Sequence, residues 1–188
     1  MLGVSGSLSA PRRCARSTMA TKIPVFVSAP TALSPEQQTS YEKIIRMLDR
    51  ENLERRALGR TDYPTEYPLK EVYLMARHCS GAVILGYSQS IAERLIVKPN
   101  TANARKIDNV KIPTPWNHLE AGILFSLRLP LMVFREDGIS GGVFDEGVTD
   151  VFINKLPIGI IDKTWEKQIV AAIQTWVARV REHYRMWN

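Results

Sequence analysis

The stretch TPWNHLEAGILFSLRLPLMVFRE, residues 114–136, reads as a helix followed directly by a buried strand. Thr114 can cap the helix, and Pro115 fits its first position, where the missing N–H of proline is no loss. Helical periodicity gathers apolar side chains on one side: Trp116, Ile123, Leu124 and Leu127. Glu120 falls in the middle of this stripe, on the face that should be buried.

The same alternation of strand and helix continues outward along the chain. Apolar runs predict strands over residues 23–30, 81–87 and 130–136, and residues 53–58 are a candidate short strand. Helical spacing and capping signals predict helices over residues 34–53, 69–79, 114–127 and 163–187. Residues 88–113 are expected to be a long, irregular, basic connection. This order predicts an α/β domain with a mostly parallel central sheet and helices on both faces.

The net charge of +6 is unevenly distributed. Residues 1–22 carry four basic side chains and no acidic one, whereas the remainder has 21 basic and 19 acidic residues. The domain therefore lacks the basic surface that would favour nucleic-acid binding. We expect residues 1–22 to be a disordered basic leader, or upstream sequence read from a mis-called start, with Met19 as the natural start. Residues 23–188 are expected to form one domain, including the C-terminal helix.

Cysteine and histidine usage gives no sign of a metal site or a disulfide framework. Cys14 and Cys79 have no metal-ligand spacing, and three histidines are scattered. This usage suits a reducing, cytoplasmic setting, with Cys79 as a small buried apolar side chain. No apolar run approaches the roughly 20 residues of a membrane span. The amphipathic C-terminal helix is expected to pack on the sheet or against a second copy of the protein, which leaves a homo-oligomer open.

The carboxyl ends of parallel strands are the expected ligand-binding edge. The residues expected there are Ser28 and Pro30, the Arg60, Asp62 and Tyr63 loop, Gly86, and the turn that leads into Trp116. Asp62 can equally well close a turn. Trp116 by itself is more typical of a core aromatic than of a ligand platform. No Rossmann or P-loop glycine pattern is present.

Glu120 has two interpretations that periodicity leaves open. A carboxylate buried without partners raises its pKa or finds hydrogen-bond donors, so Glu120 can be structural. Alternatively, Glu120 and Trp116, one turn apart, face a ligand with a planar base and a sugar. A carboxylate there can stabilise or attack the oxocarbenium-like state of glycosidic cleavage.

Three motifs resemble the Toll/interleukin-receptor (TIR) domain and the nucleoside 2-deoxyribosyltransferase-like group: a first strand ending in Ser-Ala-Pro, the strand GAVILGY, and residues 114–136. Trp116 and Glu120 are similar to the TIR pattern of a tryptophan preceding the catalytic glutamate. Glu120, Gly122 and Pro130 match the corresponding transferase-like stretch. The resemblance covers most of residues 23–157 and departs in the opening strand and in the long 88–113 connection.

The resemblance implies a flavodoxin-like three-layer sandwich and a hydrolase that cleaves an N-glycosidic bond. NAD is the first candidate substrate, in defence or signalling, and no further cofactor or metal is implied. Glu120 would be catalytic, and the binding residues would be Trp116, Tyr63, Ser28, Pro30, Arg60, Asp62 and Gly86. The alternatives are a non-catalytic TIR-like module that senses a nucleotide or assembles with a partner protein, and a deoxyribosyltransferase. Pro-Trp-Asn-His ahead of Glu120, where a transferase is expected to have Asp-Gly, favours the TIR-like interpretation.

Overall fold

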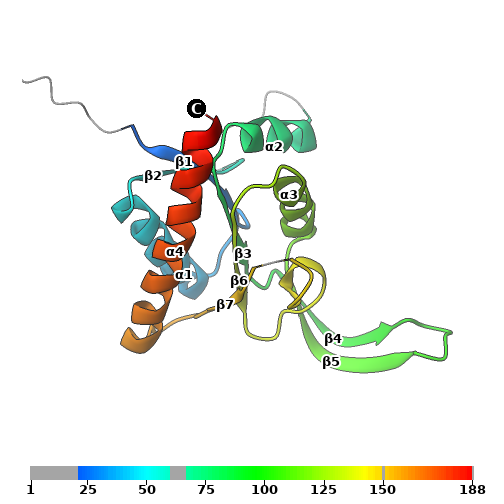
Figure 1. The fold of residues 1–188 in the computed structure, drawn as a ribbon. Coiled ribbons are helices and arrows are strands. Elements are labelled where there is room, and N and C mark those ends of the chain that lie inside the picture. The colour runs from blue at the N-terminus through cyan, green and yellow to red at the C-terminus, as the bar shows by residue number, and fades with distance from the viewer. Residues whose placement is uncertain (1–20, 60–66, 150, 188) are drawn as a thin grey trace, which may run out of the picture.

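A five-stranded parallel sheet forms the centre of the computed structural model, which describes residues 21–59, 67–149 and 151–187. The sheet order is β2-β1-β3-β6-β7, and every neighbouring pair is parallel (Figure 1). The strands are β1 (Ile23–Ser28), β2 (Leu53–Arg56), β3 (Ala82–Gly86), β6 (Leu131–Glu136) and β7 (Ile153–Leu156). The predicted α/β class is confirmed, and the strand order is that of a flavodoxin-like sandwich.

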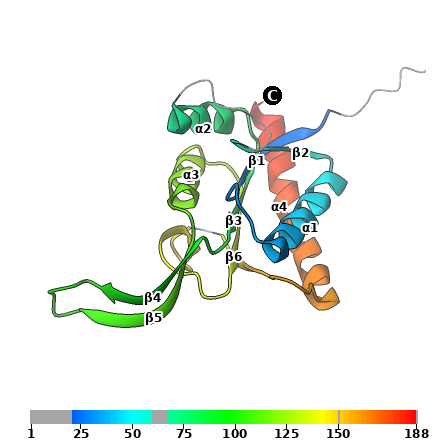
Figure 2. The same cartoon turned by 180° about the vertical axis from the view of Figure 1, so that it is seen from behind.

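Within the described ranges, four α-helices cover the two faces of the sheet. They are α1 (Pro35–Arg50), α2 (Pro68–Arg77), α3 (Pro115–Ser126) and α4 (Lys163–Trp187). Helices α1 and α4 lie on one face, and α2 and α3 lie on the other (Figures 1 and 2). The capping box predicted for α1 is present, because Ser34 Oγ accepts from Gln37 N and Gln37 Oε1 accepts from Ser34 N.

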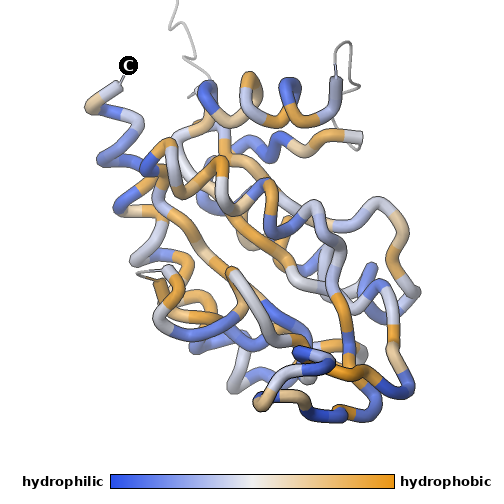
Figure 3. Tube along the Cα trace, turned by 90° about the vertical axis from the view of Figure 1, so that its right-hand side faces the viewer, coloured by the Kyte–Doolittle hydropathy of each residue, from blue (hydrophilic) through white to orange (hydrophobic). Residues whose placement is uncertain are grey.

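The three central strands, β1, β3 and β6, are largely apolar because both of their faces are covered. Successive side chains of a strand point to opposite faces. In β1, Val25 and Val27 belong to the core under α1 and α4, whereas Phe26 belongs to the core under α2 and α3. Figure 3 shows hydrophobic stretches running through the middle of the molecule. Such two-sided burial is typical of a central parallel sheet.

The predicted irregular connection over residues 88–113 is wrong: this segment is a β-hairpin. Strands β4 (Ser90–Val97) and β5 (Arg105–Ile112) pair antiparallel and project from the body (Figure 1). Leu95 lies opposite Ile107, but the strands mix apolar and charged side chains and are largely exposed, so no clean alternation marks them. Residues 90–112 hold five basic and two acidic residues, so the surplus basic charge outside the leader belongs to this hairpin.

Helix α4 packs on the sheet, which was one of the two predicted outcomes. Trp176, Val177 and Val180 are buried in the core that α4 shares with α1. A Cβ on Gly81 would lie 2.5 Å from a Val180 methyl carbon, so the small residue before β3 allows the close approach of the helix. In the part of the chain that is described, no helix is long and apolar enough to cross a membrane.

Candidate active site

A cavity of about 310 Å³ lies at the carboxyl edge of the sheet, beside the end of β1. Its wall comes from four segments that are distant in the sequence: Ala29, Pro30 and Thr31 after β1; Leu58, Gly59 and Pro68 on either side of residues 60–66; Gln89 ahead of β4; and Thr114, Trp116, Asn117 and Glu120 at the start of α3. This is the edge at which parallel α/β sheets bind ligands. The described part of the chain has no group of His, Cys, Asp and Glu suited to hold a metal ion.

The cap of α3 positions Glu120 at this cavity. Thr114 Oγ1 accepts a hydrogen bond from Trp116 N at 3.3 Å, and Pro115 occupies the first turn, as predicted. Glu120, partly exposed, therefore lies in the second turn of the helix and lines the cavity. Burial raises the pKa of the Glu120 carboxyl to about 7, although a hydrogen bond with Ser28 opposes the shift. Near neutral pH this carboxyl consequently exists in both protonated and ionised forms.

Ser28 links the glutamate to the neighbouring asparagine. The Asn117 Nδ2 atom donates to Ser28 Oγ at 2.7 Å, and the Ser28 side chain is in turn hydrogen-bonded to Glu120. Both Ser28 and Asn117 are almost fully buried. The last residue of β1 and the first two turns of α3 are thereby joined by a continuous polar connection.

The apolar stripe predicted for α3 is confirmed at Ile123, Leu124 and Leu127, which pack in the core under α2 and α3, but it is wrong at Trp116. The buried residues of this helix are Asn117, Ala121 and Leu124, whereas Trp116 is 42% exposed. Trp116 and Glu120 lie beside the buried face, and both line the cavity. The prediction centred the stripe on large apolar residues, but Asn117 takes the buried place because Ser28 satisfies its amide nitrogen.

The other predicted binding residues fall into three groups. Pro30 is buried and lines the cavity together with Trp116. Gly86 is not among the lining residues, and a Cβ there would lie 2.4 Å from the Phe144 ring, so close packing explains this glycine. Arg60, Asp62 and Tyr63 lie outside the described residues, although Gly59 and Pro68 line the cavity on either side of them.

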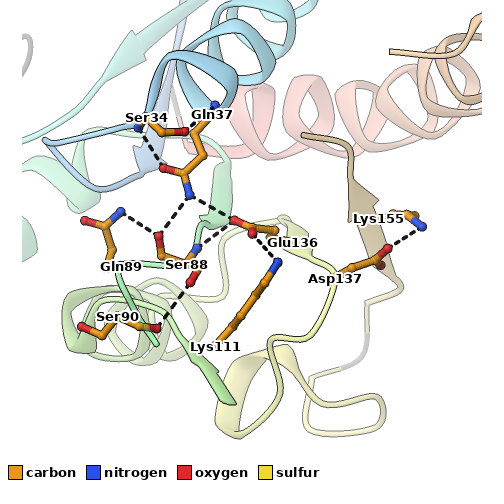
Figure 4. Close-up of polar contacts among 9 residues, drawn as sticks. All are labelled: Ser34, Gln37, Ser88, Gln89, Ser90, Lys111, Glu136, Asp137 and Lys155. Atoms are coloured by element: carbon orange, nitrogen blue, oxygen red, sulfur yellow. Dashed lines mark hydrogen bonds and ion pairs between the residues drawn. The ribbon is translucent and has the colours of Figure 1, made fainter. Parts of the chain in front are cut away.

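A second carboxylate, Glu136 at the end of β6, holds the surrounding segments in place (Figure 4). It is 6% exposed and accepts from Gln37 Nε2 at 3.1 Å and from Ser88 N at 3.0 Å. Lys111 Nζ, at the base of the hairpin, lies 2.7 Å from its other carboxylate oxygen. Because Ser88 precedes the cavity residue Gln89, this cluster fixes one part of the cavity wall.

The pKa of the Glu136 carboxyl is lowered, because charge and hydrogen bonding outweigh the effect of burial. Burial by itself would raise the pKa of this carboxyl, but hydrogen bonds from Lys111, Ser88 and Gln37 and the positive charge of Lys111 lower it overall. Glu136 is therefore ionised at neutral pH and serves as an anchor, whereas Glu120 titrates. Sequence reasoning missed Glu136 and Asn117, because their partners are 25 to 99 residues away in the chain.

The arrangement suits chemistry that needs one titratable carboxylate beside an aromatic surface in a small cavity. Glu120 can hold a negative charge against a developing cation or exchange a proton, and Trp116 offers a partly exposed ring next to it. No family model matches the chain, and no curated protein matches it either.

Proposed function

We propose that this protein cleaves the N-glycosidic bond of a nucleotide, with NAD as the first candidate substrate and Glu120 as the catalytic residue. The observation that carries the proposal is the position of Glu120: a carboxyl with a pKa of about 7, lining a cavity at the carboxyl edge of the sheet. Perturbed carboxyls in such cavities are candidates for catalytic groups. The TIR-like spacing of Trp116 and Glu120 supports the same proposal.

The proposed reaction needs only the chain, the nucleotide and water. The bond between the sugar C1′ and the base nitrogen breaks, and its electron pair leaves with the base. The ionised Glu120 carboxylate stabilises the oxocarbenium-like sugar or adds to C1′. Water then supplies the oxygen that ends on C1′, and one proton is released. With NAD the products are nicotinamide, ADP-ribose and a proton.

The substrate test compares NAD and deoxynucleosides in separate incubations with purified protein, and liquid chromatography detects free base. We expect base release from NAD by the wild type and a fall of at least about 100-fold in Glu120→Gln, which keeps the shape and removes the charge. Glu93→Gln, on the exposed hairpin, is the matched control and should keep the wild-type rate.

Three outcomes contradict the proposal. If Glu120→Gln retains the wild-type rate, Glu120 is not catalytic. Nucleotide binding without base release identifies a non-catalytic module instead. Exchange of the base on a deoxynucleoside, in the presence of a second base and without hydrolysis of NAD, identifies a deoxyribosyltransferase.

A further inference from the structure

Asn117 has a buried amide oxygen that the fold does not satisfy. The residue is 0% exposed and forms part of the cavity wall in the first turn of α3. Its Nδ2 atom donates to Ser28 Oγ at 2.7 Å. Its Oδ1 atom is buried and has no hydrogen-bond partner within the described residues. Buried polar atoms are nearly always paired, so an unpaired one in a cavity wall calls for an explanation.

The orientation of this amide is fixed by its neighbours. The Ser28 side chain is hydrogen-bonded to Glu120 and also accepts from Asn117 Nδ2. When Glu120 is ionised, the single hydroxyl proton of Ser28 must go to the carboxylate, because a carboxylate can only accept. Rotating the Asn117 amide by a half turn would then place oxygen against oxygen. With the amide held in this orientation, the Asn117 atom that has no partner is the acceptor Oδ1.

We propose that Asn117 Oδ1 accepts a hydrogen bond from an N–H group on a planar heteroaromatic ring that lies against Trp116. Trp116 is adjacent in the sequence, lines the same cavity and leaves 42% of its surface exposed. A flat ring that lies against the Trp116 side chain would present its edge to Asn117, the neighbouring residue of the cavity wall. The inference rests on the proposed function, and it assigns Asn117 as the residue that selects for a donor-bearing base.

The test measures binding alone, so that it does not depend on turnover. Two pairs of probes differ by one NH2 group: nicotinamide against 3-acetylpyridine, and 9-methyladenine against 9-methylpurine. Protein-observed NMR titrations give the dissociation constants. We expect the donor-bearing member of at least one pair to bind about tenfold more tightly to the wild type, as one hydrogen bond to a buried acceptor allows.

Variants then assign this preference to the amide oxygen. Asn117→Ala should reduce the preference to less than about twofold. The same NMR spectra must show wild-type peak dispersion for Asn117→Ala, which guards against a misfolded alanine variant. Gln89→Ala changes another polar lining residue and should leave the preference unchanged.

Equal binding within both pairs, or no binding of any probe, overturns the inference. So does a preference that survives in Asn117→Ala, because another acceptor would then be responsible. Base release from NAD together with either result leaves the proposed function standing and removes only the role of Asn117. Conversely, a donor preference that depends on Asn117 in a protein without cleavage activity rejects the catalytic proposal and keeps this one.

Discussion

Lys111 and Glu136 form an ion pair of 2.7 Å that ties the base of the projecting hairpin to the end of β6. The carboxylate is almost fully buried, and the ammonium is half-buried. The pair is therefore shielded from water, unlike the Arg94–Asp108 pair farther out on the hairpin, whose side chains are 71% and 66% exposed. The two ion pairs should contribute very differently to stability.

Removing the Lys111 ammonium should destabilise the fold. Lys111→Met leaves Glu136 buried with only its neutral donors, at a cost of about 1–3 kcal/mol in the free energy of unfolding. Arg94→Met, which breaks the exposed pair, should change this free energy by less than about 0.5 kcal/mol. Urea unfolding at pH 7 measures both. Equal effects of the two variants would show that the Lys111 pair does not anchor the hairpin.

Glu120 should make the fold less stable as pH rises from about 5 to 8. Its folded pKa, about 7, lies above the reference value of 4.5, so the folded state retains a proton that the unfolded chain has already lost. Stability from this group is fully present below the unfolded pKa and is lost as pH rises through the folded pKa. Glu120→Gln should therefore be more stable than the wild type at pH 8, by about 1–3 kcal/mol, and close to it at pH 4.5. Parallel stability curves for the two proteins, from urea unfolding at each pH, would argue against a raised pKa.

Alanine substitution should change stability in opposite directions at Gly86, which is tightly packed, and at Gly122, which has free space around it. In Gly86→Ala the new Cβ would lie 2.4 Å from the Phe144 ring, so we expect a loss of about 1–3 kcal/mol. Gly122, in α3, has no atom within 4 Å of such a Cβ, and Gly122→Ala should gain about 0.5–1 kcal/mol from helix propensity. Thermal or urea unfolding measures both changes. A smaller loss when Gly86→Ala is combined with Phe144→Leu would assign the cost to that contact.

Trp176 should be the most costly tryptophan to truncate in α4. Its side chain is 5% exposed, and its Nε1 atom donates to the Pro130 carbonyl at 2.9 Å. Trp176→Ala should cost about 3–5 kcal/mol, and Trp176→Phe, which keeps the ring bulk and loses the donor, about 1 kcal/mol. Trp187, 75% exposed near the end of the helix, supplies the control, since Trp187→Ala should be nearly neutral. Denaturant midpoints that fall equally for Trp176→Ala and Trp187→Ala would contradict the packing of α4 on the sheet.

The sequence by itself determined the elements whose signals are local. The capping box of Ser34 and Gln37 and the Thr114–Pro115 start of α3 depend on residues within one turn, and the structure has both where they were predicted. The strands β1, β2, β3 and β6 also lie within their predicted ranges, whereas β7 was not predicted. The alternation of strand and helix was likewise sufficient for the α/β class. Helical periodicity also singled out Glu120, because a carboxylate within an apolar stripe can be recognised from the sequence alone.

The tertiary structure decided which side chains meet. The partners of Glu136 come from α1, the segment after β3 and the end of β5, and Asn117 bonds to Ser28 across 89 residues of chain. Periodicity could not show that Asn117, rather than Trp116, takes the buried place on α3, because the cost of burying an amide depends on a partner from another strand. The hairpin was missed for a related reason: its strands are held by pairing with each other and not by a buried apolar face, so they leave no clear period in the sequence.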